Sequence, residues 1–291
     1  MHKQLVLLCG VVAAASSVVF IRESASPPIM LAAWRCGIAA LLLSPLAIRA
    51  WRQTRPPLAA AVQSAWLPAT VLAIHLIGWN IGARLTPAAN ATLIVSMVPL
   101  AMPVLLYLML RERVSQRERI ATAIASLGLA VLAIADFDAD PAWLLGDAIC
   151  FGSMVLLALY LVYSRKTADS ISLWLYLVPL YGIASLLCAL VGWTLEGGYW
   201  PDSPYQALQL LAIGAVSTVL GHSILNWGMR VFSGQHVALL SLMQFVFAGV
   251  FGWWLYSEVP TLAFILTASA ITLAAAWVIH APDSGQHRAG G

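Results

Sequence analysis

The sequence predicts an all-α integral membrane protein with ten transmembrane helices, built as two five-helix repeats of inverted topology. Three observations support this prediction: the composition, ten long apolar runs, and an internal match between the two halves of the chain. Of the 291 residues, 61% are hydrophobic and 9% are charged, whereas soluble domains carry about 25% charged residues. A core in water could not bury this much apolar surface, so lipid is expected to cover the outside of the protein.

Ten apolar runs are long enough to cross a bilayer, which takes about 20 mostly apolar residues in a helix. In order, they lie near residues 4–21, 28–48, 64–83, 88–110, 119–135, 144–163, 172–195, 207–228, 235–256 and 261–280. Prolines and small polar residues typical of helix ends separate many of them, as at 26–28, 55–57, 86–87, 140–141, 201–204 and 259–260. The linkers are too short to hold a soluble domain, so the whole chain is expected to be the membrane part.

The charges between the runs predict the orientation. Twelve Lys and Arg residues fall on the side that holds both termini, and two, Arg22 and Arg84, fall on the other side. Under the positive-inside rule, this bias places both termini in the cytoplasm. The expected location of the protein is the plasma (inner) membrane. Adding or removing one span would scramble the bias, so the charges also support a count of ten.

The two halves of the chain match when the sequence is shifted by 146 residues. The matched polar residues, which rarely coincide by chance, are Asn80 with Asn226, Arg84 with Arg230, and Glu112 with Glu258. Residues 1–145 and 146–291 are therefore each expected to form one five-helix repeat. Because five is odd, the second repeat enters the membrane upside down. Many secondary transporters are built in this way, with the substrate site near mid-membrane between the halves.

Two segments carry a recognisable pattern. Residues 86–114 combine a small-residue helix start, a mid-helix Pro99 and a terminal Glu-Arg pair, and residues 33–43 place Arg35 early in the second run. These segments resemble the EamA-type transporters of the drug/metabolite transporter superfamily, and the resemblance covers nearly the whole chain. It implies a ten-helix carrier of small organic solutes, often an exporter of amino acids or other metabolites. Phe245 stands where the family commonly has a second proline, which leaves open whether both halves share a hinge.

Polar side chains within the apolar runs mark a candidate solute site. An ionisable group at bilayer depth costs about 2.5–3.5 kcal/mol on insertion scales, so each one needs a partner or a cavity. Helical spacing places His75 and Trp79 on one face, and His222 and Asn226 on one face of the equivalent run. The candidate substrate-binding residues are Arg35, His75, Trp79, Asn80, Ser96, His222, Asn226, Ser241 and Gln244. The alternative for each is a hydrogen-bonded packing residue.

Arg35 has two possible roles. Its guanidinium could hold a substrate carboxylate, or it could bond helix-end carbonyls or pair with an acid. The family resemblance implies an arginine here for unlike substrates, which favours the structural role. Asn90 is a further uncharged donor that we expect to face the same region.

The acidic residues lie at the ends of the runs and none lies at mid-membrane. Their placement argues against a strongly cationic drug and against the Glu-centred proton exchange of small multidrug carriers. Glu112 and Glu258 are expected to pair with Arg113, Arg117 or nearby backbone donors. Asp147 suits the positive N-terminal end of its helix.

Enzymatic and nucleic-acid functions have no support in the sequence. We find no Gly-rich phosphate loop, nucleophile elbow or His/Glu metal spacing, so no catalytic residue, cofactor or metal is expected. No Lys/Arg cluster forms a stripe that would bind nucleic acid. The cysteines, which we expect to be buried, lie in apolar runs without paired spacing: Cys9, Cys36, Cys150 and Cys188.

These features favour a secondary transporter that exports a small metabolite, such as an amino acid, by alternating access. Its expected partners are a small-molecule solute and the lipid bilayer, and a monomer is compatible with all of them. The alternatives are a drug or nucleotide-sugar carrier of the same superfamily, and a non-transporting membrane enzyme or scaffold. The sequence leaves open the solute, the direction of transport, and the choice between proton coupling and facilitated diffusion.

Overall fold

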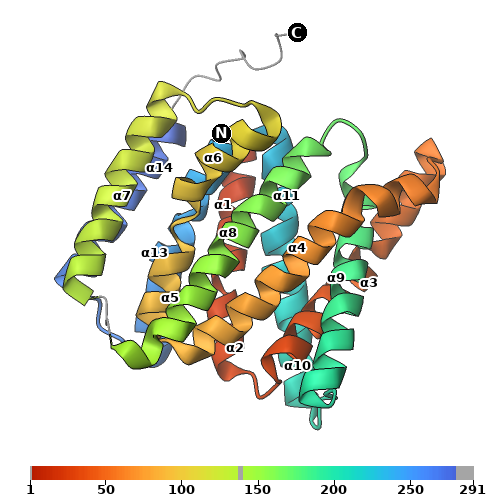
Figure 1. Ribbon diagram of the computed structural model, residues 1–291, viewed down its shortest axis with the longest axis horizontal. Coiled ribbons are helices and arrows are strands. Elements are labelled where there is room, and N and C mark those ends of the chain that lie inside the picture. The colour runs from red at the N-terminus through yellow and green to blue at the C-terminus, as the bar shows by residue number, and fades with distance from the viewer. Residues whose placement is uncertain (1, 137–139, 280–291) are drawn as a thin grey trace.

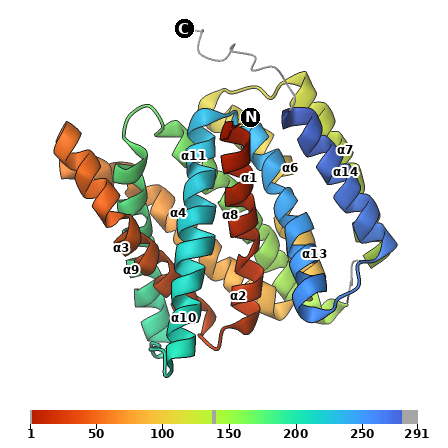
Figure 2. The same ribbon diagram turned by 180° about the vertical axis from the view of Figure 1, so that it is seen from behind.

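The computed structural model describes residues 2–136 and 140–279 (Figures 1 and 2). Within these residues the secondary structure is helical with no strand, and ten helical segments are long and apolar enough to cross a membrane. The predicted fold class is confirmed. Both figures place the start of the first span and the end of the last span on one face, which we call the terminal face; the other end of the bundle is the distal face.

Several spans consist of more than one helical piece. In chain order the spans are α1 (His2–Ala15) with α2 (Ser17–Glu23); α3 (Pro28–Thr54); α4 (Leu58–Leu85); α5 (Ala88–Val95) with α6 (Val98–Leu110); α7 (Gln116–Asp136); the 3-10 turn η1 (Pro141–Trp143) with α8 (Leu144–Lys166); α9 (Leu173–Glu196); α10 (Pro204–Ala212) with the π-helix η2 (Ile213–His222) and α11 (Ser223–Val231); α12 (Gly234–Ser241) with α13 (Met243–Tyr256); and α14 (Leu262–Ile279).

The fourth and ninth spans end in the same way, on opposite faces of the bundle. Arg111 and Ser257, which are 146 residues apart, both have left-handed backbones with φ of 56° and 58°. In each turn the next amide, of Glu112 or Glu258, donates to a carbonyl six residues back at 3.3 Å. The amide of each left-handed residue donates to the carbonyl four residues back, at 3.0 Å for Arg111 and 3.1 Å for Ser257. This is the αL cap, which satisfies the last carbonyls of a helix. The internal repeat is thus visible in backbone geometry as well as in sequence.

The same two spans are also interrupted at equivalent positions. α5 gives way to α6 at Ser96 and Met97, and α12 gives way to α13 at Leu242. At both breaks the backbone bonds tighten to three residues, from Met97 to Ile94 and from Leu242 to Leu239. Phe245 replaces a proline in the second copy, yet the break is present, so both halves contain an interrupted helix.

Close backbone contacts hold the spans together. α3 packs along α9, α4 packs on α8 and α9, and α7 and α14 lie side by side at one edge (Figures 1 and 2). α1 and η2 meet at Gly221, where an added Cβ would lie 2.8 Å from the Cα of Ala14. Small residues of this kind let membrane helices approach closely without a hydrophobic driving force.

The outer surface is apolar, as a lipid environment requires. Large side chains such as Ile134 and Trp254 are 88% and 78% exposed. Three cysteines are buried, but Cys9 is exposed. The expectation that all four thiols fill buried space is therefore wrong for Cys9, because α1 turns that residue outward.

We expect the terminal face to be cytoplasmic, because it holds most of the positive charges between spans. A reporter active only in the cytoplasm should function when fused after Lys166 and fail when fused after Asp202. The reverse pattern would contradict the orientation, and activity at both positions would remove one span from the topology.

Candidate functional site

The two helix breaks face a small shared cavity. Its volume is about 30 Å³, and its walls come from α5, α6, α8, α11, α12 and α13. Three of the predicted site residues, Ser96, Ser241 and Gln244, line it. The hydroxyls of Ser96 and Ser241 donate to carbonyls one turn back, at 2.7 and 2.8 Å. Interrupted helices at corresponding positions of two halves are a feature of transporter binding sites.

His75 is held by Ser153 of α8. Its Nδ1 lies 2.8 Å from both the carbonyl oxygen and the Oγ of Ser153, and Ser153 Oγ donates to the His75 carbonyl at 2.9 Å. A carbonyl only accepts, so Nδ1 carries the proton in this arrangement. In the neutral ring Nε2 is then an acceptor.

His222 is held in the opposite tautomer. The amide of Asn226 donates to the Tyr160 hydroxyl at 2.8 Å, which leaves the hydroxyl proton for His222 Nδ1 at 3.2 Å. In the neutral ring Nε2 is then a donor. The rings of His75 and His222 lie with centroids 6.4 Å apart. The structure thus brings together two histidines from different halves, one with an accepting and one with a donating Nε2.

Arg35 lies in the same core and is 1% exposed. Its Nε donates to Thr218 Oγ1 of η2 at 3.0 Å, while its two terminal nitrogens have no hydrogen-bond partner. No helix-end carbonyl and no carboxylate bonds to it among the described residues, so the structural partners expected from the sequence are wrong. Thr218 sits in a ten-residue π-helix, a geometry that is rare in helices and frequent at functional sites.

Two predicted site residues lie elsewhere. Asn80 donates to the carbonyl of Pro28 at 2.8 Å and ties α4 to the start of α3. Trp79 is buried in a separate apolar cluster with residues such as Leu31 and Ile94. Asn90, which we expected to face the central region, instead contacts the Asp147 carboxylate at the distal end. The sequence pattern placed these residues on suitable helices but could not determine their partners.

Several buried hydroxyl residues of the core were not predicted. Tyr160 and Tyr181 are fully buried, and Tyr181 lies 3.2 Å from the Ser223 hydroxyl. The available signal was a tyrosine placed deep in a leucine-rich span, since a buried tyrosine needs a partner for its hydroxyl. We call Arg35, His75, Tyr160, His222 and Asn226 the core polar cluster.

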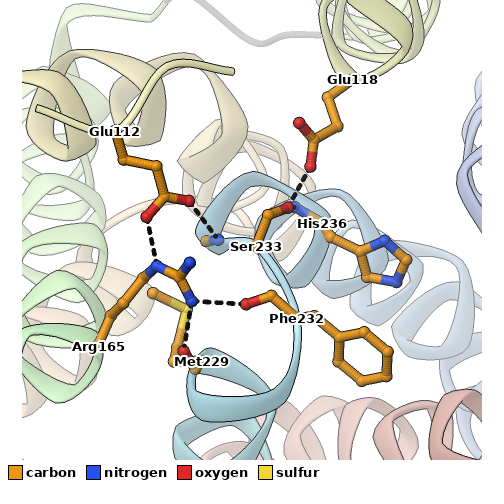
Figure 3. Close-up of polar contacts among 8 residues, drawn as sticks. Glu112, Glu118, Arg165, Met229, Phe232, Ser233 and His236 are labelled. Atoms are coloured by element: carbon orange, nitrogen blue, oxygen red, sulfur yellow. Dashed lines mark hydrogen bonds and ion pairs between the residues drawn. The ribbon is translucent and has the colours of Figure 1, made fainter. Parts of the chain in front are cut away.

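A charged network closes the terminal face (Figure 3). Glu112, just after α6, forms an ion pair with Arg165 of α8. Arg165 also donates to the carbonyls of Met229 and Phe232 at 2.8 and 2.6 Å, and Glu118 accepts from Ser233. The expectation that Glu112 pairs with Arg113 or Arg117 is wrong, because α8 brings a better-placed arginine from the other half. The backbone donor expected as the alternative is present, since the Gly234 amide donates to Glu112 Oε1 at 3.5 Å.

The distal face holds the counterpart pair. Glu258, just after α13, forms an ion pair with Arg22 of α2, with 2.9 Å between Glu258 Oε1 and Arg22 Nη1. The Arg22 guanidinium lies over the Tyr256 ring, 4.5 Å from its centroid. A cavity of about 210 Å³ opens beside this pair and is lined also by Asn90 and Phe264.

Comparison with known proteins agrees with this architecture. The model of the EamA-like transporter family matches residues 3–134 and 144–280. One solved crystal structure, of a protein described in no further detail, superposes with a TM-score of 0.78 at 19% identity, over 95% of this chain and 96% of that chain. At that identity the likeness shows the fold alone. No curated protein sequence matches the chain.

The family match spans most of the chain and covers both groups of five spans. Ten apolar helices, two inverted repeats and this match agree with one another. The chain belongs to the EamA-like transporter family and is an integral membrane transporter of the drug/metabolite superfamily.

Proposed function

We propose that the protein is a secondary carrier that exports a small organic metabolite, such as an amino acid, by alternating access. Both termini would lie in the cytoplasm, the carrier would sit in the plasma (inner) membrane, and residues 1–145 and 146–291 would form its two repeats. One observation carries the proposal: two Glu–Arg ion pairs occupy repeat-related positions at opposite ends of the bundle and differ in burial.

The internal repeat relates the two ion pairs to each other. Glu112 and Glu258 follow matching turns, 146 residues apart. Each glutamate binds an arginine at the end of the first span of the other half: Arg165 ends α8, and Arg22 lies near the end of α2. Because the halves are inverted, the same device appears once on each face.

The two pairs differ in their surroundings. The side chains of Arg165 and Glu112 are 22% and 14% exposed, whereas those of Arg22 and Glu258 are 40% and 52% exposed. The terminal pair also holds the turn between α11 and α12 through the carbonyls of Met229 and Phe232. This conformation is closed more tightly at the terminal face than at the distal face, as one of two access states would be.

Alternating access would exchange the burial of the two ion pairs. Breaking a buried ion pair by removing one partner costs about 3–5 kcal/mol, whereas an exposed pair contributes about 0–1 kcal/mol. In the proposed second state, the Arg22–Glu258 pair is buried as the partly buried Arg165–Glu112 pair opens to water. The inverted repeat supplies two such pairs of equivalent design.

The solute would bind between the faces. Two helices, α8 and α11, connect the cavity at the helix breaks to the core polar cluster. They line the cavity with Leu157, Leu161 and Leu225. The same two helices carry Tyr160 and Asn226 of the cluster. The residues of the cavity and of the cluster come from both halves. A site built in this way changes shape when the halves move relative to each other.

The direct test is uptake by proteoliposomes that contain the purified protein. We expect saturable exchange of at least one solute from a panel of amino acids, and no exchange in protein-free liposomes. Uptake restricted to cationic drugs or to nucleotide sugars would replace the proposed solute class, and no exchange of any organic solute would contradict the carrier function.

Glu112→Gln should open the terminal face. The protein, carrying Ser241→Cys, would be placed in vesicles of known orientation and treated with a membrane-impermeant maleimide. The labelling of protein that keeps Ser241 would be subtracted to remove the contribution of the native cysteines. Loss of the buried pair should speed labelling from the terminal side on the order of tenfold or more. The matched Glu258→Gln should change labelling within about fivefold, because its pair is exposed.

A charge exchange serves as the control for this experiment. Glu112→Arg combined with Arg165→Glu keeps an ion pair at the same place and should restore part of the closure. Equal effects of Glu112→Gln and Glu258→Gln would contradict the assignment of unequal gates.

Gln244→Ala should weaken solute binding. Removing one neutral hydrogen-bonding group costs about 0.5–1.5 kcal/mol, so KM should rise about two- to tenfold with normal amounts of folded protein. Gln63→Ala, at an exposed position of α4, is the matched control and should leave KM unchanged. An unchanged KM in Gln244→Ala would remove this residue from the solute site.

A further inference from the structure

We infer that the transported solute carries a single carboxylate, which the guanidinium of Arg35 binds in the core of the bundle. This inference deepens the proposed function and rests on it, because a carrier must expose the buried Arg35 in one of its access states.

Arg35 has most of its hydrogen-bonding capacity unused. A guanidinium carries five N–H donors and stays protonated in proteins. Nε donates to Thr218 Oγ1 at 3.0 Å, and the two terminal nitrogens, which carry the other donors, have no partner although they are fully buried. The Thr218 hydroxyl itself donates to the Ile213 carbonyl at 3.2 Å, so it acts on Arg35 only as an acceptor.

Among the residues that the structure describes, no acidic side chain pairs with this charge. The acidic side chains that the structure describes lie at the ends of the spans. Glu196, the last residue of α9, lies against the start of α3. Its carboxylate already accepts hydrogen bonds from the amides of Ile29 and Met30, at 3.1 and 2.9 Å. Burying an unpaired ion costs several kcal/mol after relaxation. An anionic ligand would remove that cost, which gives the site a preference for negative solutes.

A carboxylate fits the unused donors in both geometry and charge. The two terminal nitrogens of a guanidinium present parallel N–H groups that match the two oxygens of a carboxylate. One carboxylate cancels one guanidinium, whereas a phosphate ester would leave net negative charge in a core whose other polar groups are uncharged hydroxyls, amides and imidazoles.

The cluster also offers an acceptor for the rest of the solute. Asn226 Oδ1 is buried and has no hydrogen-bond partner, while the Nδ2 of the same amide is engaged by Tyr160 and the His222 carbonyl. His222 follows Thr218 by four residues and lies one turn further along the same span. Donor and acceptor from different halves therefore suit a solute with a carboxylate and a separate N–H or O–H group.

Ligand binding can be measured without transport. The purified protein in detergent would be heated with 2-methylpropanoate, its neutral isostere 2-methylpropanamide, leucine, or inorganic phosphate, at concentrations up to on the order of 10 mM. A ligand that binds only the folded state raises the unfolding temperature. We expect saturable increases with 2-methylpropanoate and leucine, and none with the amide or phosphate.

Variants of α3 assign the effect to Arg35. Arg35→Gln should weaken carboxylate binding on the order of 100-fold, because both charge-assisted hydrogen bonds are lost. Arg35→Lys keeps the charge without the two-pronged geometry and should weaken binding on the order of tenfold, so it decides the question if Arg35→Gln does not fold. Arg52→Gln, at an exposed position of the same helix, should bind as the wild type does.

Three results would overturn the inference: an equal response to the carboxylate and the amide, an unchanged response in Arg35→Gln or Arg35→Lys, or no response to either carboxylate. None of them bears on the labelling of Ser241→Cys or on uptake by proteoliposomes. Failure of the carboxylate site can therefore be separated from failure of the carrier function.

Discussion

The constraint on which this structure depends is that a protein in lipid must satisfy its own charges and backbone groups. The described acids obey it at the ends of the spans, where Glu196 binds the amides of α3 and Glu112 binds Arg165. Other buried polar atoms also lack a partner, among them two nitrogens of Arg230, but Arg230 Nη1 donates to the carbonyls of Ala168 and Ile171. Arg35 is 1% exposed and both of its terminal nitrogens are unpartnered. A buried charge with this much unused hydrogen-bonding capacity is where a ligand has the most to contribute.

Much of the fold could be predicted because the features that a lipid environment requires can be read from contiguous stretches of sequence. The length of each apolar run and the charge bias are properties of contiguous sequence, and the ten spans follow from them. The helix breaks are a different case. Phe245 left open whether both halves share a hinge, and α12 and α13 break as α5 and α6 do, because the tightened backbone bond at Leu242 needs no proline.

Only part of the candidate site could be predicted, because the hydrogen-bond partners of its side chains come from other spans. His75, His222 and Asn226 were predicted from polar residues at helical spacing. Ser96, Ser241 and Gln244 were predicted as uncharged hydrogen-bonding groups of the fourth and ninth spans. The positions of Asn80 and Asn226 are equivalent in sequence but not in use: one ties α4 to α3, and the other supports Tyr160 and His222. Which neighbour an amide meets depends on packing between spans, which a single sequence does not encode locally.

The contact between Gly221 and Ala14 has a mechanical consequence. The two backbones touch there, with no room for even a methyl group, so α1 and η2 cannot come closer together at this point. The first span ends near Arg22 and the eighth carries Thr218 and His222. These spans belong to different halves and are in backbone contact at this point. A displacement of the first span toward the eighth is therefore opposed by the backbone of the span that carries two groups beside Arg35.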